Sequence, residues 1–155
     1  MMQTTVRPPA KLDVLTQVLN KQVANFNVLY VKLHHFHWYV QGPHFFELHA
    51  KFEELYDEIT AHMDDVAERL LTIGGQPLST MSAYLQHASI QEAAGGETAA
   101  QMVQFVHDDL SLIIRELLEG IEEAEKQADR TTADLLLGIH ASLDKHGWML
   151  RAFLG

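Results

Sequence analysis

Hydrophobic residues recur at steps of three and four along most of the chain, and this spacing predicts four long amphipathic helices. We expect them over residues 11–39, 45–73, 98–128 and about 131–153. A short fifth helix is expected over residues 80–87, within the connection between the second and third long helices. No strand-like alternation of apolar and polar residues competes with this pattern. The predicted fold class is therefore all-α.

Glycine and proline pairs mark the ends of these segments. Gly42–Pro43 separates the first two helices, Gly74–Gly75 ends the second, and Gly95–Gly96 closes the long connection that follows. Four long helices with one long crossover predict a ferritin-like four-helix bundle over residues 11–155. Residues 1–10 are expected to form a short flexible tail.

Five side chains of the metal-ligand type lie on or beside the apolar stripes of the first two helices. They are His37, His49, Glu53, Asp64 and Glu68. Imidazole nitrogens and carboxylate oxygens in this mixture suit iron, manganese or zinc. The alternatives are a buried histidine with an ordinary polar partner for His37, and a solvated helix face for Asp64 and Glu68.

The spacing of these residues along the second helix indicates where a metal site would lie. His49 and Glu53 are four residues apart, as are Asp64 and Glu68, so each pair shares one face of the helix. Glu53 and Asp64 are separated by eleven residues, or about 16 Å along the axis, which is too far for one ion. Two copies packed antiparallel about a two-fold axis near Glu58–Ile59 would bring the opposite ends together. The sequence therefore predicts a site shared between subunits.

Composition narrows the function further. The chain has 155 residues, 47% of them hydrophobic, with no cysteine and a formal net charge of −10. An acidic chain is poorly suited to coat nucleic acid but attracts cations. No apolar run approaches a membrane span and no signal peptide is visible, so we expect a soluble, cytoplasmic protein. No Glu-x-x-His motif occurs, which argues against a di-iron site within one bundle.

Nearly the whole chain resembles the Dps proteins (DNA-binding proteins from starved cells, or miniferritins). The resemblance is densest in KLHHFHWYVQGPHFFELHAKFEELYDEI, MDDVAERLLTIGGQPLSTM and DKHGWMLRAFLG. It implies a homo-dodecamer with a hollow core and ferroxidase centres at its two-fold interfaces. Fe(II) would be oxidised there, by hydrogen peroxide in preference to dioxygen, and stored as an Fe(III) mineral.

The resemblance also assigns roles to individual residues. His37, His49 and Glu53 would bind iron from one subunit, and Asp64 and Glu68 from its two-fold mate. Many family members have Asp at the position of Glu53, so direct contact of this longer side chain with iron is in question.

Further family positions have an ordinary structural alternative beside the functional one. Trp38 would lie beside the centre, or simply pack in an interface. Glu54 would nucleate mineral, or remain a solvated charge. Glu125, Asp129 and Asp134 would line an acidic three-fold pore for iron entry, or serve as helix-capping acids. Arg130 departs from the acidic pattern of some relatives and would pair with Asp129 or Glu125.

Two other functions compete with iron storage. The first is a nucleoid-associated protein that compacts DNA and whose iron chemistry is secondary. Because the chain before the first helix offers only Arg7 and Lys11, we expect DNA binding to be weak or absent. The second is a shell occupied by zinc or manganese with little oxidase turnover.

Overall fold

Five helices make up the computed structural model, which describes residues 13–155. They are α1 (Val14–Tyr39), α2 (Phe45–Thr72), α3 (Met81–His87), α4 (Ala99–Lys126) and α5 (Arg130–Leu154). The all-α bundle with a short helix in the crossover is thus confirmed. The expected tail at residues 1–10 lies outside the described residues.

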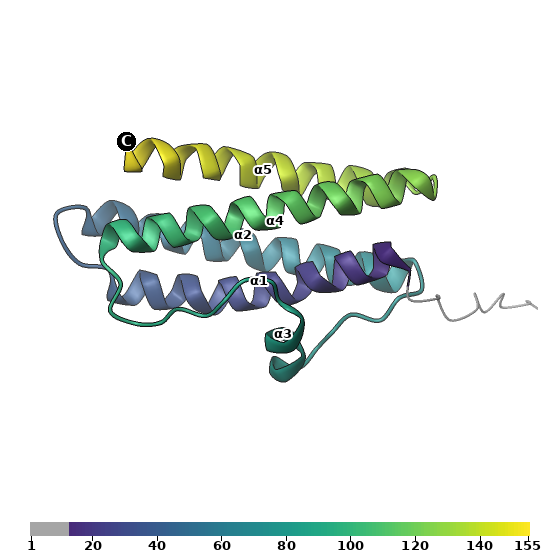
Figure 1. Ribbon diagram of the computed structural model, residues 1–155, viewed down its shortest axis with the longest axis horizontal. Coiled ribbons are helices and arrows are strands. Elements are labelled where there is room, and N and C mark those ends of the chain that lie inside the picture. The colour runs from purple at the N-terminus through teal and green to yellow at the C-terminus, as the bar shows by residue number, and fades with distance from the viewer. Residues whose placement is uncertain (1–12) are drawn as a thin grey trace, which may run out of the picture.

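The four long helices run side by side, and their connections define the topology (Figure 1). Short turns join α1 to α2 and α4 to α5, so each pair is antiparallel. The crossover that carries α3 runs back along the bundle beside α1 before α4 begins, which leaves α2 and α4 pointing the same way (Figure 1). This one long crossover is the arrangement expected of a ferritin-like bundle.

Polar side chains at the N-termini explain where the helices begin. Asp13 accepts a hydrogen bond from the Thr16 N–H and so caps α1. Thr98 and Gln101 form a reciprocal capping box at the start of α4. Helix α5 begins at Arg130, one residue before the expected start at about 131, because the Asp129 side chain accepts from the Thr132 N–H and caps the helix.

The helices pack through the apolar stripes that the spacing predicted. Phe26, Phe36 and Phe52 are completely buried between α1 and α2, and burial of each such ring contributes roughly 1.5–3 kcal/mol. Gly120 allows α4 to approach its neighbours, because a Cβ there would lie 2.9 Å from a Leu136 methyl group and 3.1 Å from a Val18 methyl group. The bundle therefore has one continuous core.

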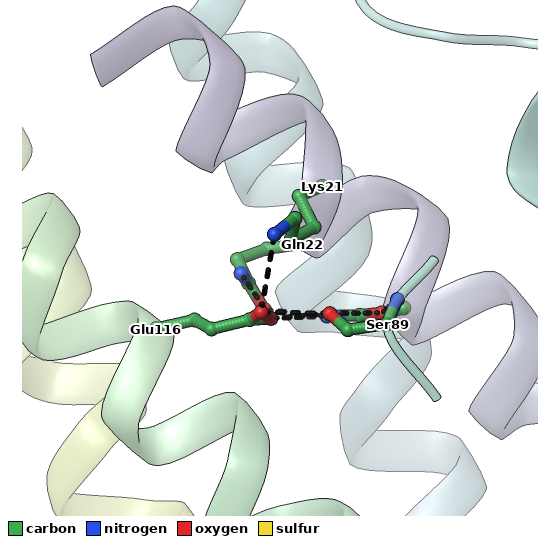
Figure 2. Close-up of polar contacts among 5 residues, drawn as sticks. Lys21, Gln22, Ser89 and Glu116 are labelled. Carbon is green, nitrogen blue, oxygen red and sulfur yellow. Dashed lines mark hydrogen bonds and ion pairs between the residues drawn. The ribbon is translucent and has the colours of Figure 1, made fainter. Parts of the chain in front are cut away.

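A buried polar cluster fastens the crossover to the bundle, and we call it the crossover network (Figure 2). Its members are Lys21, Gln22, Asn25, Ser89 and Glu116. The Glu116 carboxylate accepts from Asn25 Nδ2 at 2.9 Å, from Gln22 Nε2 at 3.3 Å and from Ser89 Oγ at 2.6 Å, and Lys21 Nζ lies 3.6 Å away. Donors from α1 and from the loop after α3 thus meet one acid on α4.

A charge pair between α1 and α4 lies beside this network. Lys32 Nζ is 2.8 Å from Asp109 Oδ2, and their side chains are only 5% and 13% exposed. Lys32 also donates to the Gln91 carbonyl at 2.9 Å. Burial raises the pKa of the Asp109 carboxyl, although the hydrogen bond and the charge of Lys32 act in the opposite direction.

Candidate metal centre

His37 on α1 and His49 on α2 are brought together across the first turn of the bundle. Their rings are stacked, with centroids 3.7 Å apart and planes inclined by 11°. His37 Nδ1 lies 2.6 Å from the His49 carbonyl oxygen, and His49 Nδ1 lies 2.7 Å from the His37 carbonyl oxygen. Each histidine is therefore held by the backbone of the other.

These reciprocal bonds determine the tautomer of both rings. A carbonyl oxygen only accepts, so Nδ1 must carry the proton and donate in each case. In the neutral ring the lone pair is then on Nε2, which is the state a metal ligand requires. Hydrogen bonding of the second nitrogen to a carbonyl is also how proteins commonly orient metal-binding histidines. Both rings can therefore present the Nε2 lone pair to a metal ion.

The three carboxylates assigned to the site lie along α2 and are exposed. Glu53, Asp64 and Glu68 make no side-chain hydrogen bond or ion pair with any residue in the described part of the chain. Over residues 13–155, no three His, Asp or Glu side chains of one chain converge on a metal position. His49 and Asp64 are fifteen residues apart on one helix, or about 22 Å. Within a single subunit the two histidines are therefore in contact, but the carboxylates do not join them in one metal site.

We call the five predicted ligands together the ligand face. Its members are His37, His49, Glu53, Asp64 and Glu68. Trp38 is adjacent in sequence but 67% exposed, and its ring contacts His34, with centroids 5.4 Å apart. In the single subunit, Trp38 therefore faces outward beside the ligand face.

The residues predicted to line an entry pore separate into two groups. Glu125, Asp134 and Arg130 line an open hollow of about 480 Å³ where α4 meets α5. Asp129 instead accepts from Thr132 and pairs with Arg69 at 3.2 Å. Partial burial alone would raise the pKa of Asp129, but these bonds and the Arg69 charge hold it below its usual value. The expected pairing of Arg130 with Asp129 or Glu125 is not found, since Arg69 occupies Asp129.

Glu54 is exposed and pairs with Lys51 at 3.2 Å. The pair leads into a cluster between α2 and α5 that sequence reasoning missed. Lys51 Nζ donates to His146 Nδ1 at 3.0 Å, so His146 Nε2 carries the proton and donates to Glu58 Oε1 at 3.1 Å. His62 Nε2 is 3.1 Å from the other oxygen of Glu58. His146 and His62 therefore both lie within hydrogen-bonding distance of the Glu58 carboxylate.

The ionisation of Glu58 follows from these contacts. Partial burial would raise its pKa, but hydrogen bonds from His146 and Ser142 hold it below the usual value. The sequence carried one signal of this cluster, namely His146 on the apolar stripe of α5. Glu58 and His62, four residues apart on α2, gave no sign that His146 would meet them.

Comparison with known proteins agrees with this architecture. Residues 16–155 match the ferritin-like domain family. The chain is 56% identical to general stress protein 20U of Bacillus subtilis, over 92% of this chain and 99% of that one. It is 58% identical to DNA protection during starvation protein 2 of Bacillus anthracis, over 89% of this chain and 94% of that one. The chain belongs to the Dps family of ferritin-like proteins.

Among solved structures, a Dps protein from Bacillus brevis superposes with a TM-score of 0.89 and 54% identity. The match covers 91% of this chain and 95% of that one. Dps membership supports a general role in iron storage and stress protection. Within residues 13–155, no helix is long and apolar enough to span a membrane.

Proposed function

We propose that the chain is a ferroxidase that oxidises Fe(II) at centres shared by two subunits. The observation that carries this proposal is the reciprocal His37–His49 pairing, which leaves two Nε2 donors ready for iron. Asp64 and Glu68 lie too far along the same helix to complete that site within one chain. A two-fold partner packed antiparallel along α2 would supply them.

The proposed chemistry uses Fe(II) as substrate and hydrogen peroxide as the preferred oxidant, with dioxygen slower. Two Fe(II) ions each give one electron to one peroxide, the O–O bond breaks, and both oxygens are reduced to the level of water. Hard carboxylate oxygens favour the more highly charged Fe(III) product, so Glu53, Asp64 and Glu68 would assist the oxidation. Pairing both electrons with one peroxide avoids release of hydroxyl radical.

The product would collect as an Fe(III) mineral inside a hollow homo-dodecamer. Exposed Glu125 and Asp134 beside the open hollow at the α4–α5 turn are the candidates for guiding iron inward. Arg130 lines the same hollow, and its positive charge would weaken that attraction. Asp129 contributes less, because its carboxylate is already bonded to Thr132 and Arg69. Glu54, although exposed, is held by Lys51 and is a weaker candidate for mineral nucleation.

Subunit mixing tests whether the centre is shared. Shells of His49→Ala chains alone and of Asp64→Ala chains alone should oxidise Fe(II) very slowly. In shells reassembled from equal amounts of both variants, half of the two-fold interfaces are mixed. Each mixed interface has one site with both groups intact and one with neither. Activity should therefore return to about a quarter of the wild-type value, by this two-fold symmetry.

The control is wild-type protein dissociated and reassembled in the same way, with subunit exchange verified by native mass spectrometry. Stopped-flow absorbance of Fe(III) formation gives the rate. If both residues served one site within a single chain, every site in the mixed shells would still lack one group. No recovery in verified mixed shells would refute the shared centre.

DNA binding is the second candidate, because the Bacillus anthracis relative is named for DNA protection. The net charge of −10 argues against direct binding. A gel-shift assay at about 150 mM salt without divalent ions should show no retardation of plasmid, since electrostatic attachment is weak at that ionic strength. A clear shift would favour the DNA-compacting role. Metal analysis of purified shells tests the remaining alternative, occupancy by zinc or manganese.

A further inference from the structure

Tyr56 of α2 lies between two histidines of α1 that are three residues apart. Its ring is stacked on His34, with centroids 3.7 Å apart and planes inclined by 17°. The same ring meets His37 edge-on, at 5.4 Å and 90°. His37 is therefore bounded by the His49 ring on one side and by the Tyr56 ring on another.

His34 is anchored in turn to its own helix. Its Nδ1 donates to the Tyr30 carbonyl at 2.8 Å, and its ring packs on the Tyr30 ring at 4.4 Å. The Tyr30 ring also meets Tyr56, at 6.1 Å and 70°. Tyr56 is thus held by two rings from α1 before it touches His37. A movement of Tyr56 would have to break these contacts first.

We propose that Tyr56 and His34 are positioning residues that fix the orientation of the His37 ring for metal binding, and that His34 is not itself a ligand. The inference rests on the proposed function, since it concerns the same site. Metal-binding side chains must be held within about 0.5 Å and 10–20° of their working geometry. The Nδ1 bond of His37 fixes one atom of the ring and the stacked His49 ring covers one side, while the edge-on ring of Tyr56 limits how far the His37 ring can turn on the other.

The requirement is for an aromatic ring at position 56 rather than for its hydroxyl. Within residues 13–155 the Tyr56 hydroxyl makes no hydrogen bond, whereas its ring packs on the rings of Tyr30, His34 and His37. Tyr56→Phe should therefore keep the function and Tyr56→Leu should lose it.

Cobalt(II) titration of assembled shells, followed by visible ligand-field absorption, measures the site without turnover. Tyr56→Leu should weaken Co(II) affinity by about 10- to 100-fold, the range found when groups that orient metal ligands are removed. Its spectrum should also change, and the KM for Fe(II) should rise while kcat stays within about three-fold. Tyr56→Phe should stay within about two-fold in every measurement. Tyr39→Leu is the matched control, because Tyr39 is exposed and its ring packs on His35 rather than on either site histidine.

The assignment of His34 has its own matched pair of variants. His34→Phe keeps a ring against Tyr56 and should bind Co(II) within about two-fold of wild type. His37→Phe removes a proposed ligand and should abolish tight binding. His34→Leu removes the ring that is stacked on Tyr56 while Tyr56 itself is unchanged. If Tyr56→Leu fails to assemble, the Co(II) affinity of His34→Leu tests the positioning role instead.

Four results would overturn the proposal: wild-type behaviour of Tyr56→Leu, wild-type behaviour of an assembled His34→Leu, equal losses in Tyr56→Phe and Tyr56→Leu, or loss of Co(II) binding in His34→Phe. Equal losses would mean that the hydroxyl, and not the aromatic ring alone, is required at position 56. Failure of the proposed function looks different, because wild-type shells would then fail to oxidise Fe(II), whatever their affinity for Co(II).

Discussion

The ligand face and the crossover network both contain acidic side chains, but they differ in whether those carboxylates have partners within the described chain. In the crossover network, the Glu116 carboxylate meets donors from Gln22, Asn25 and Ser89. On the ligand face, Asp64 and Glu68 are exposed and their carboxylates are unpaired with any described residue. The carboxylate of the first region is satisfied within one subunit, whereas those of the second are left available, as the proposed shared metal site requires.

This difference shows how a fold separates structural from functional polar groups. A buried acid is tolerated only when it is hydrogen-bonded, so the crossover network must be satisfied for the subunit to fold. Ligands for a substrate ion must instead remain available after folding. Helix α2 contains both kinds, since Glu58 is bonded to His146 and Ser142 while Asp64, six residues later, is not.

The largest effect on stability is expected beside the crossover network, at the Lys32–Asp109 pair. Lys32→Met would leave the buried Asp109 carboxylate without its cation and should lower the free energy of unfolding by about 3–5 kcal/mol. Guanidinium unfolding followed by circular dichroism, at fixed subunit concentration, measures this. The double variant Lys32→Met/Asp109→Leu should recover most of the loss. If the double variant were as unstable as the single one, the unpaired charge would not be the cause.

A smaller loss is expected from the network itself. Glu116→Leu would deprive the buried amides of Gln22 and Asn25 of their shared acceptor and should cost about 1–3 kcal/mol. Its matched control is Glu119→Leu, an exposed acid on the same helix, which should change stability by less than about 0.5 kcal/mol. Similar values for the two variants would show that the network does not stabilise the bundle.

The sequence predicted the helices well because the apolar spacing and the Gly–Pro breaks act locally. The end of α4 was less predictable: Ala128 adopts φ +57, a left-handed conformation rare for alanine, and the helix stops at Lys126 instead of the expected residue 128. The Asp129 cap follows from that turn. Neither feature is visible in the hydrophobic pattern.

The site residues show a similar division. Proximity of His37 and His49 was predictable, since one lies at the end of a helix and the other near the start of the next. Their reciprocal bonds to backbone carbonyls depend on how the two helices pack. The meeting of Glu116 with Asn25 joins residues 91 positions apart, and no local pattern predicts such a contact. The pairing of His49 with Asp64 across subunits stays a prediction.

Glu58 provides an intermediate case on α2, the helix that carries four of the five residues of the ligand face. Because its pKa is lowered in the folded state, its ionised form stabilises the fold above the ordinary pKa of 4.5, and this contribution is lost as the pH falls through the lowered value. Glu58→Gln should cost about 1 kcal/mol at pH 7. The difference from wild type should narrow as the pH is lowered below 4.5 in chemical unfolding experiments. A difference that is independent of pH would mean that the charge of Glu58 is irrelevant.

The smallest effect on stability is expected where the effect on activity is large. Asp64→Asn alters an exposed side chain with no partner in its own subunit, so the free energy of unfolding should change by less than about 0.5 kcal/mol. The amide keeps the shape of the carboxylate but lacks its negative charge, which strengthens the binding of a hard cation. Fe(II) oxidation by peroxide should therefore fall at least 10-fold in shells of normal size, as measured by stopped-flow absorbance.

The control is Asp65→Asn, at the neighbouring exposed position, which should leave the free energy of unfolding and the oxidation rate near wild type. If Asp64→Asn instead destabilised the subunit as much as Glu116→Leu, Asp64 would contribute to folding as the acid of the crossover network does. The ligand face and the crossover network would then not differ in the way argued above.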